Sequence, residues 1–244
     1  MTERRIGTDD EWKAARDALL AEEKELTRRG DELTKKRRDL PWVPVEKEYA
    51  FETEEGQQTL RELFGGRSQL VIYHFMFGPQ YSAGGCPVCT SIGDTLNPQV
   101  PHLAARDTTL MLASRAPLDQ LLAYRERMGW EIPWVSSDGS DFNRDLGFLS
   151  TEEELQPWLD SGEIPPTVEQ NARMCGTDAL GYVMERPGLS VHARENGSVY
   201  RTYVTTARGL EAPGMAYYAL LDRTPKGRDE SPTEPLWLRR HDEY

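Results

Sequence analysis

Three consecutive segments decide the fold: the apolar run Leu70-Val-Ile-Tyr-His-Phe-Met-Phe77, the loop Gly78-Pro-Gln-Tyr-Ser-Ala-Gly-Gly85, and the motif Cys86-Pro87-Val88-Cys89. The apolar run is rich in β-branched and aromatic side chains, which predicts a strand buried on both faces of a parallel or mixed sheet. Proline is favoured in the first turn of a helix, so we expect a helix to begin at or near Pro87. The two cysteines therefore lie where a buried strand ends and a helix begins.

Strand and helix patterns alternate on both sides of this stretch. Strands are expected at Tyr49–Thr53 and Thr108–Ala113, and Asn196-Gly197 between two alternating runs predicts a hairpin. The other expected elements are a short helix at 59–64 ended by Gly65, a helix from Pro87 to about Asn97, a helical piece around His102, a helix from Pro117 to Met128, a short strand at 134–137 and a final helix at 215–221. This order predicts an α/β protein with a mixed sheet flanked by helices.

A long helix precedes this domain. The pair Thr8 and Glu11 is a capping-box signature at its start, and prolines stop it after residue 40. Leucine or tryptophan recurs every seven residues along it, at Trp12, Leu19, Leu26, Leu33 and Leu40. The row is narrow for a coiled coil, so two interpretations stay open: a surface helix that lies on its own domain, or an arm that forms a homodimer or docks a partner.

We therefore expect three regions. Residues 1–44 would be a helical arm, 45–230 a single domain, and 231–244 a polar tail. Residues 140–185 are irregular and interrupted by prolines, so they are expected to be a partly helical insertion before the C-terminal hairpin.

Composition narrows the function classes. The net charge is −12, and an acidic protein repels phosphate groups, so neither nucleic acid nor an anionic membrane is an expected partner. No apolar run approaches the length of a membrane span, and the polar start predicts no secretory signal. We expect a cytoplasmic protein.

The motif Cys86-Pro87-Val88-Cys89 carries the expected chemistry. A helix N-terminus stabilises a thiolate through its free N–H groups and dipole, and Cys86 lies closest to that end. Cys89, one turn later, is placed to attack a mixed disulfide formed at Cys86, while Pro87 stiffens the turn. A CxxC beside such a strand and helix is a thioredoxin-like sign.

Two other interpretations of the pair remain open. Zinc requires about four ligands, so Cys175 with His74, His102 or His192 would have to complete a set with the pair, and no metal-binding spacing joins them. The second interpretation is that the pair is inert or vestigial. We expect no metal and no bound cofactor, and Cys175 is interpreted as an isolated thiol or as a third redox partner.

Motifs spread over most of residues 20–230 resemble a known family. They are Gly84-Gly-Cys-Pro-Val-Cys89, His102-Leu-Ala-Ala-Arg-Asp107, Ser114-Arg-Ala-Pro-Leu118, Met128-Gly-Trp130, Pro133-Trp-Val-Ser-Ser137, Gly139-Ser-Asp-Phe-Asn143 and Thr224-Pro-Lys-Gly-Arg228. With these motifs the sequence resembles the DUF899 family of thioredoxin-like proteins, and more widely the peroxiredoxin-like members of that superfamily. The resemblance implies a thioredoxin-like fold and does not specify a function.

The sequence departs from the peroxiredoxin pattern at one position, and the resemblance implies one further residue of the site. Peroxiredoxins place Thr or Ser three residues before the peroxide-reacting cysteine, and here that position is Ala83, although Pro79 fits the pattern. This favours disulfide exchange over peroxide reduction. Thioredoxin-like sites also face a cis-proline across the dithiol, and Pro187 is our candidate for it.

Other residues have both a structural and a functional interpretation. Arg115 follows the strand at 108–113 and is placed to reach the edge of the site, or it is a surface charge. Trp130 and Trp134 line a pocket beside the dithiol or simply pack in the core. His74 lies in the buried strand, where a core histidine is the ordinary role.

The sequence thus predicts a thiol–disulfide oxidoreductase in which Cys86 attacks and Cys89 resolves. Its partners would be a disulfide or another small-molecule substrate and an electron donor of unknown identity. The alternatives are a thiol peroxidase that uses Cys86, and a thioredoxin-fold binding protein without catalysis. Because a fold does not determine a function, all three functions stay open at the level of sequence.

Overall fold

The computed structural model describes residues 5–206, 209–231 and 236–244. The chain divides into two compact units, Met1–Pro41 and Trp42–Tyr244. Residues 232–235 of the expected polar tail lie outside the described residues. None of the described helices is both long and apolar enough to cross a membrane.

The first unit contains helix α1 (Asp9–Arg38). The capping box is present, because the Glu11 N–H donates to the Thr8 hydroxyl and the Thr8 N–H donates to the Glu11 carboxylate. The row that begins at Trp12 follows one side of α1, since residues seven apart return to nearly the same face. Its use in a homodimer stays a prediction.

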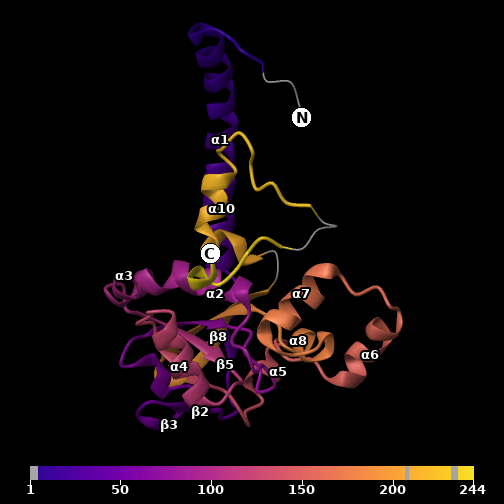
Figure 1. Ribbon diagram of the computed structural model, residues 1–244. Helices are drawn as coiled ribbons and strands as arrows, with labels where there is room; N and C mark the ends of the chain where they lie inside the picture. The colour runs from indigo at the N-terminus through magenta and orange to yellow at the C-terminus, as the bar shows by residue number, and fades with distance from the viewer. Residues whose placement is uncertain (1–4, 207–208, 232–235) are drawn as a thin grey trace. The chain divides into compact units, whose positions relative to one another are not determined.

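The second unit is built on a mixed sheet, some strands of which are labelled in Figure 1. Among the described residues the sheet has eight strands in the order β1-β8-β7-β4-β5-β6-β2-β3. The strands are β1 (Val43–Pro44), β2 (Ala50–Thr53), β3 (Gly56–Thr59), β4 (Gln69–His74), β5 (Thr108–Ser114), β6 (Trp134–Ser136), β7 (Gly188–Glu195) and β8 (Ser198–Thr206). Its helices are α2 (Pro87–Leu96), α3 (Val100–Ala104), α4 (Leu118–Arg127), α5 (Phe142–Asp145), α6 (Glu152–Asp160), α7 (Pro166–Cys175), α8 (Ala179–Met184), α9 (Glu211–Gly214) and α10 (Ala216–Leu221).

The neighbouring strands β8, β7, β4 and β5 have the thioredoxin-like arrangement. β4 and β5 are parallel, as the crossover through α2 and α3 requires. β7 runs antiparallel to β4, and β8 antiparallel to β7. β6 extends the sheet parallel to β5, and β2 pairs with it. The expected thioredoxin-like mixed sheet flanked by helices is confirmed.

Alternation along β4 places side chains in two cores, one on each face of the sheet. Leu70 and Ile72 pack in one core, and Tyr73 and Phe75 pack in the other, which also contains the cysteines of the motif. Tyr73 therefore points to the face covered by α2. This alternation places the Tyr73 side chain beneath the dithiol.

The turn residues explain which of the expected helices and strands the structure contains and which it does not. Asn196 and Gly197 both have positive φ, as a tight hairpin between β7 and β8 needs. The short helix expected at 59–64 is wrong: Gly56–Thr59 pairs with β2, and only Glu62–Phe64 forms a 3-10 turn. The φ of 103° at Gly56 makes this hairpin possible, and the pattern of apolar residues did not reveal it.

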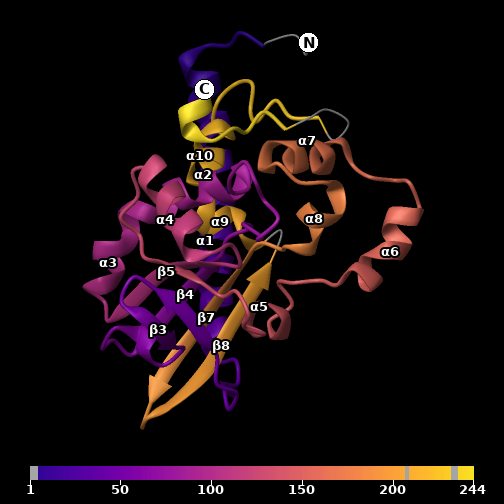
Figure 2. The same cartoon turned by 60° about the horizontal axis from the view of Figure 1, so that its bottom comes forward.

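Residues 142–184 form the four helices α5 to α8, which Figure 2 shows beside the end of the sheet that carries α2. α6 begins with a capping box of Thr151 and Glu154, and α7 ends at Gly176, which has a positive φ. Local signals of this kind determine where these helices begin and end. The packing of the helices beside α2 places α8 next to the dithiol.

Candidate active site

Cys86 is the N-cap residue of α2, immediately before Pro87, as the sequence predicts. Its N–H donates to the Met76 carbonyl at 3.0 Å, which ties the motif to the end of the central strand. Its carbonyl accepts from the N–H and the hydroxyl of Thr90, both at 2.9 Å. The Cys86 backbone is thus fixed on both sides, and its sulfur lies at the N-terminus of the helix.

Two side chains that are hydrogen-bonded to each other, Tyr182 and Asn171, lie next to the sulfur of Cys86. The Tyr182 hydroxyl lies 3.1 Å from Sγ, and the Asn171 amide nitrogen lies 3.1 Å from the same hydroxyl. Because Asn171 donates to the hydroxyl oxygen, the phenolic proton of Tyr182 is directed at the sulfur. Cys86 itself is 1% exposed, so this donor acts in a site with little competing water.

The two cysteines differ in acidity. Burial on its own raises the pKa of Cys86, but hydrogen bonds from the Cys89 thiol, the Tyr182 hydroxyl and the backbone N–H groups of Val88 and Cys89 outweigh it and lower that pKa to about 7. Burial, together with the hydrogen bond to Cys86 and its charge, raises the pKa of Cys89 well above its ordinary value. The thiolate at neutral pH is therefore on Cys86.

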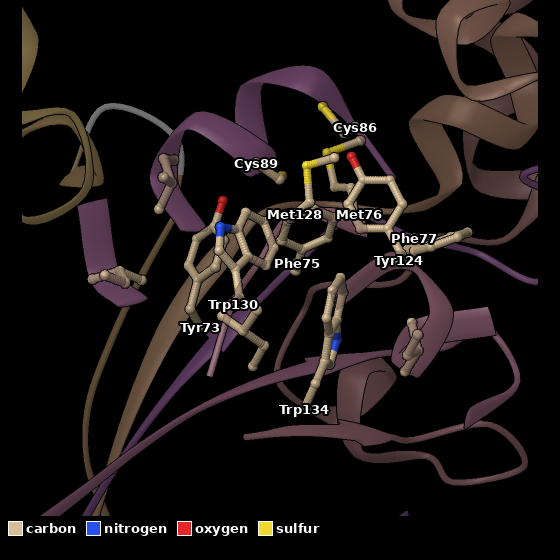
Figure 3. Packing of buried hydrophobic residues seen from close by; sticks show 14 of the residues in the cluster. Tyr73, Phe75, Met76, Phe77, Cys86, Cys89, Tyr124, Met128, Trp130 and Trp134 are labelled. Atoms are coloured by element: carbon tan, nitrogen blue, oxygen red, sulfur yellow. The ribbon is translucent and has the colours of Figure 1, made fainter. Parts of the chain in front are cut away.

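Tyr73 lies under the dithiol. Its hydroxyl is fully buried and bonds to no nitrogen or oxygen atom of the described residues. In Figure 3 the Tyr73 hydroxyl points toward Cys89. Burial, followed by the charge of Cys89 and a hydrogen bond with it, raises the pKa of this phenol well above its ordinary value, so it stays protonated and can donate to the Cys89 sulfur.

A cleft of about 760 Å³ opens beside the two sulfurs. Tyr73, Cys86, Cys89, Tyr182 and Glu185 line it, together with the apolar side chains Met76, Val88, Ile92, Leu155, Trp158, Val183, Pro187, Leu210 and Met215 and the rim residues Glu154, Arg186 and Glu211. A cleft of this size, mostly apolar and with a few converging polar groups, is typical of small-molecule sites.

Glu185 is the buried charge of this cleft. Its Oε1 accepts from the Arg115 guanidinium at 2.8 Å, and its side chain is 2% exposed. Burial raises the pKa of Glu185 to about 7, and the attraction of Arg115 opposes that rise. Perturbed carboxyl groups of this kind cluster at functional sites.

The loop before Cys86 is fastened to the end of α7 and to the C-terminal segment. The Ser82 hydroxyl donates to the Gly176 carbonyl at 2.7 Å, and the Ala83 N–H donates to the Cys175 carbonyl at 3.0 Å. Arg240, 4% exposed, donates to the carbonyls of Gly85 at 3.0 Å and Met174 at 2.7 Å. These bonds hold the sulfur of Cys86 against Tyr182.

Residues 1–244 match the family described as a bacterial protein of unknown function, DUF899. The chain belongs to this family. No curated protein matches the DUF899 chain in sequence.

Solved peroxiredoxins are similar to the DUF899 chain in structure. The bacterioferritin comigratory protein of Xanthomonas campestris is 19% identical with a TM-score of 0.41, over 70% of this chain and 90% of that one. Peroxidoxin BcpB of Mycobacterium tuberculosis is 12% identical with a TM-score of 0.40, over 72% and 96%. Thioredoxin peroxidase I of Plasmodium yoelii is 10% identical with a TM-score of 0.43, over 74% and 85%.

The structure of the DUF899 chain places the predicted supporting residues differently from the expectation. Pro187 lines the cleft with both cysteines, but it is not a cis-proline, since no cis peptide bond occurs among the described residues. Arg115 pairs with Glu185, so it acts on the cleft through that carboxylate. Trp134 is buried in the core with its ring N–H bonded to Ser114, and it does not line the cleft.

Neither the histidines nor Cys175 line the cleft beside the dithiol. His74 is held between Asn143 and Ser190, and burial lowers the pKa of its ring to about 3. Burial likewise lowers the pKa of His192 to about 4. Within the described residues, no group of three or more acidic, His or Cys side chains is arranged to hold a metal ion. Cys175 is a buried free thiol, and burial together with the charge of Cys86 raises its pKa.

Sequence reasoning missed Tyr182, Asn171, Tyr73, Glu185, Trp158 and Arg240. Tyr73 carried a signal, because a tyrosine within a run expected to be buried needs a partner for its hydroxyl. The others lie in the irregular region 140–185 or in the C-terminal segment, where no pattern connects them with the motif.

Proposed function

We propose that the chain is a thiol–disulfide oxidoreductase in which Cys86 attacks and Cys89 resolves. The observation that carries the proposal is the difference between the two thiols. Cys86 receives a directed hydrogen bond from Tyr182 and lies at a helix N-terminus, whereas Cys89 lies one turn deeper with a raised pKa. A nucleophile whose pKa is close to the ambient pH is near the optimum for attack on a disulfide.

The exchange proceeds in two steps. The Cys86 thiolate attacks one sulfur of the substrate disulfide, and the other substrate sulfur leaves and takes up a proton. The Cys89 thiolate then attacks Sγ of Cys86, the second substrate thiol leaves, and a Cys86–Cys89 disulfide remains. Two electrons pass from the protein to the substrate, and a dithiol reductant returns the protein to its reduced form. A reducing compartment such as the cytoplasm suits this cycle.

Tyr73 fits the second step. It is a protonated phenol that bonds to no nitrogen or oxygen atom of the described residues and faces Cys89, which becomes an anion before it attacks. A hydrogen bond from Tyr73 to that thiolate would stabilise charge as it develops, which is where a preorganised donor accelerates a reaction most.

Two features make peroxide a poorer substrate than a disulfide. The Cys86 N–H is already bonded to the Met76 carbonyl, so it is not free for a peroxide oxygen. The position three residues before Cys86 is Ala83, which has no hydroxyl to donate. Peroxide reduction at Cys86 is accordingly the competing outcome of the test.

The test compares the reduced wild-type protein with Cys86→Ser, Cys89→Ser and, as a matched control, Cys175→Ser. Each is exposed to hydrogen peroxide and to hydroxyethyl disulfide, and thiol loss is mapped on peptides. The proposal expects fast loss of both motif thiols with the disulfide, no reaction in Cys86→Ser, and wild-type behaviour in Cys175→Ser. Faster loss with peroxide would make the protein a peroxidase. Unchanged reactivity in Cys86→Ser would refute Cys86 as the attacking thiol, and survival of both motif thiols in the wild-type protein with either oxidant would favour a binding role.

A further inference from the structure

We propose that the cleft beside the dithiol receives a small organic disulfide that has an apolar body and a hydrogen-bond donor directed at Glu185. This inference rests on the proposed function and names the substrate class for it. Three observations carry it: the apolar wall, the position of the sulfurs in that wall, and the carboxylate of Glu185, which has one oxygen without a hydrogen bond among the described residues.

The wall of the cleft selects an apolar body. Its inner surface consists mostly of aliphatic and aromatic side chains from α2, α6 and α8 and from the residue before α9, such as Ile92, Leu155, Trp158 and Leu210. A charged body placed against this surface would lose its hydration without gaining partners, whereas an apolar body loses only unfavourable contact with water. The wall therefore disfavours a strongly charged disulfide such as glutathione disulfide.

The depth of the sulfurs selects a small molecule. Cys86 and Cys89 are each 1% exposed, and both border the cleft. A disulfide held within a folded protein cannot bring its sulfur to Sγ of Cys86 without inserting its own backbone into the cleft. A small disulfide reaches the same point as a free molecule.

Glu185 supplies an unused acceptor. Its Oε1 is held by Arg115, and Oε2 accepts no hydrogen bond within the part of the chain that the structure describes. The carboxylate lines the same cleft as the two sulfurs. Because Arg115 already balances its charge, the complementary ligand group is a neutral or cationic N–H or O–H donor, and a ligand carboxylate is repelled.

Three disulfides of the same shape test this selection. Diphenyl disulfide has no donor, bis(4-aminophenyl) disulfide has an N–H donor, and bis(4-carboxyphenyl) disulfide has a carboxylate. Each reacts in single turnover at pH 8 with the reduced full chain, and each rate is divided by the rate with free dithiothreitol to remove differences in leaving group. At this pH Glu185 is ionised, because burial raises its pKa only to about 7.

We expect the normalised rate of the amino compound to exceed that of diphenyl disulfide about 10-fold, as for one hydrogen bond to a charged group. The carboxy compound should be slower than both, and glutathione disulfide slower still. In Glu185→Gln the advantage of the amino compound should shrink to about 3-fold or less, because a neutral amide is a weaker acceptor than a carboxylate. Equal normalised rates for the three aryl compounds in the wild-type protein would overturn the inference.

Binding of sulfides that cannot react gives a second readout that does not depend on any variant folding. Calorimetry on the wild-type protein compares bis(4-aminophenyl) sulfide with diphenyl sulfide, and the amino compound should bind about 10-fold more tightly. Equal affinities, or no binding of either, would contradict the substrate class. If the wild-type protein forms its Cys86–Cys89 disulfide with hydroxyethyl disulfide but shows no selection, only this inference fails. If no disulfide forms with any compound, the proposed function fails as well.

Discussion

Removal of the Tyr182 hydroxyl should raise the pKa of Cys86. In the wild-type protein this hydroxyl is 3.1 Å from Sγ and is directed there by Asn171. A hydrogen bond to a charged group contributes about 1.5–3 kcal/mol, and one pKa unit corresponds to about 1.4 kcal/mol. Tyr182→Phe should therefore raise the pKa from about 7 by about 1 to 2 units.

The rate change is smaller than the change in thiolate fraction and reverses with pH. At pH 7 the thiolate fraction should fall from about one half to about 0.1 or 0.01, while each thiolate becomes about 3-fold more nucleophilic per pKa unit. Attack on a neutral disulfide should thus slow about 2- to 6-fold at pH 7. At pH 9.5, where thiolate predominates in both proteins, the variant should be about 2-fold or more faster.

The assay is the pH–rate profile of Cys86 with hydroxyethyl disulfide, quenched with acid and read by peptide mapping. Tyr81→Phe is the matched control, because Tyr81 is also buried and also loses one hydrogen bond, from its hydroxyl to the Tyr182 carbonyl at 2.9 Å, without touching the sulfur. The control should keep the wild-type profile. A profile for Tyr182→Phe that superimposes on the wild type would refute the assignment of Tyr182 as the donor to Cys86.

Three further predictions follow from the same geometry. Cys89→Ser should trap the substrate as a mixed disulfide on Cys86, seen by mass spectrometry as about one adduct per chain, and absence of an adduct would exclude Cys89 as the resolving residue. Arg240→Met should lower the free energy of urea unfolding by about 2–5 kcal/mol, because the buried carbonyls of Gly85 and Met174 lose their donor; a loss under about 1 kcal/mol would contradict the clamp. Burial raises the pKa of Glu185 from 4.5 to about 7, so the folded state binds this proton more tightly than the unfolded state. The free energy of unfolding should therefore fall as pH rises from about 4.5 to 7, by at most about 3 kcal/mol. The Glu185→Gln variant should show a flatter pH dependence, and parallel curves for the two proteins would contradict this prediction.

The central part of the fold was predictable because its signals are local. The run that becomes β4 is apolar over consecutive residues, Pro87 follows the cap residue Cys86 directly, and Asn196-Gly197 lies between two alternating strands. Each signal spans fewer than about ten residues, which is the range over which periodicity and turn chemistry act.

The surroundings of the dithiol were not predictable in the same way, because they depend on long-range packing. Tyr182 is 96 residues from Cys86 along the chain, and Arg240 is 155 residues from Gly85. Nothing in the sequence near Tyr182 indicates that α8 packs against the N-terminus of α2. Arg115 shows the same limit, since its position after the strand left it either at the edge of the site or as a surface charge, and the structure pairs it with the buried Glu185.

The most direct test of the account is to identify the disulfide that forms when the reduced wild-type protein meets one equivalent of hydroxyethyl disulfide. The protein is digested after free thiols are blocked, and the linked peptides are identified by mass spectrometry. The account predicts a single linkage, Cys86 to Cys89, with Cys175 recovered as a blocked free thiol. Recovery of Cys86 and Cys89 as free thiols, or a linkage of Cys86 to Cys175, would contradict it.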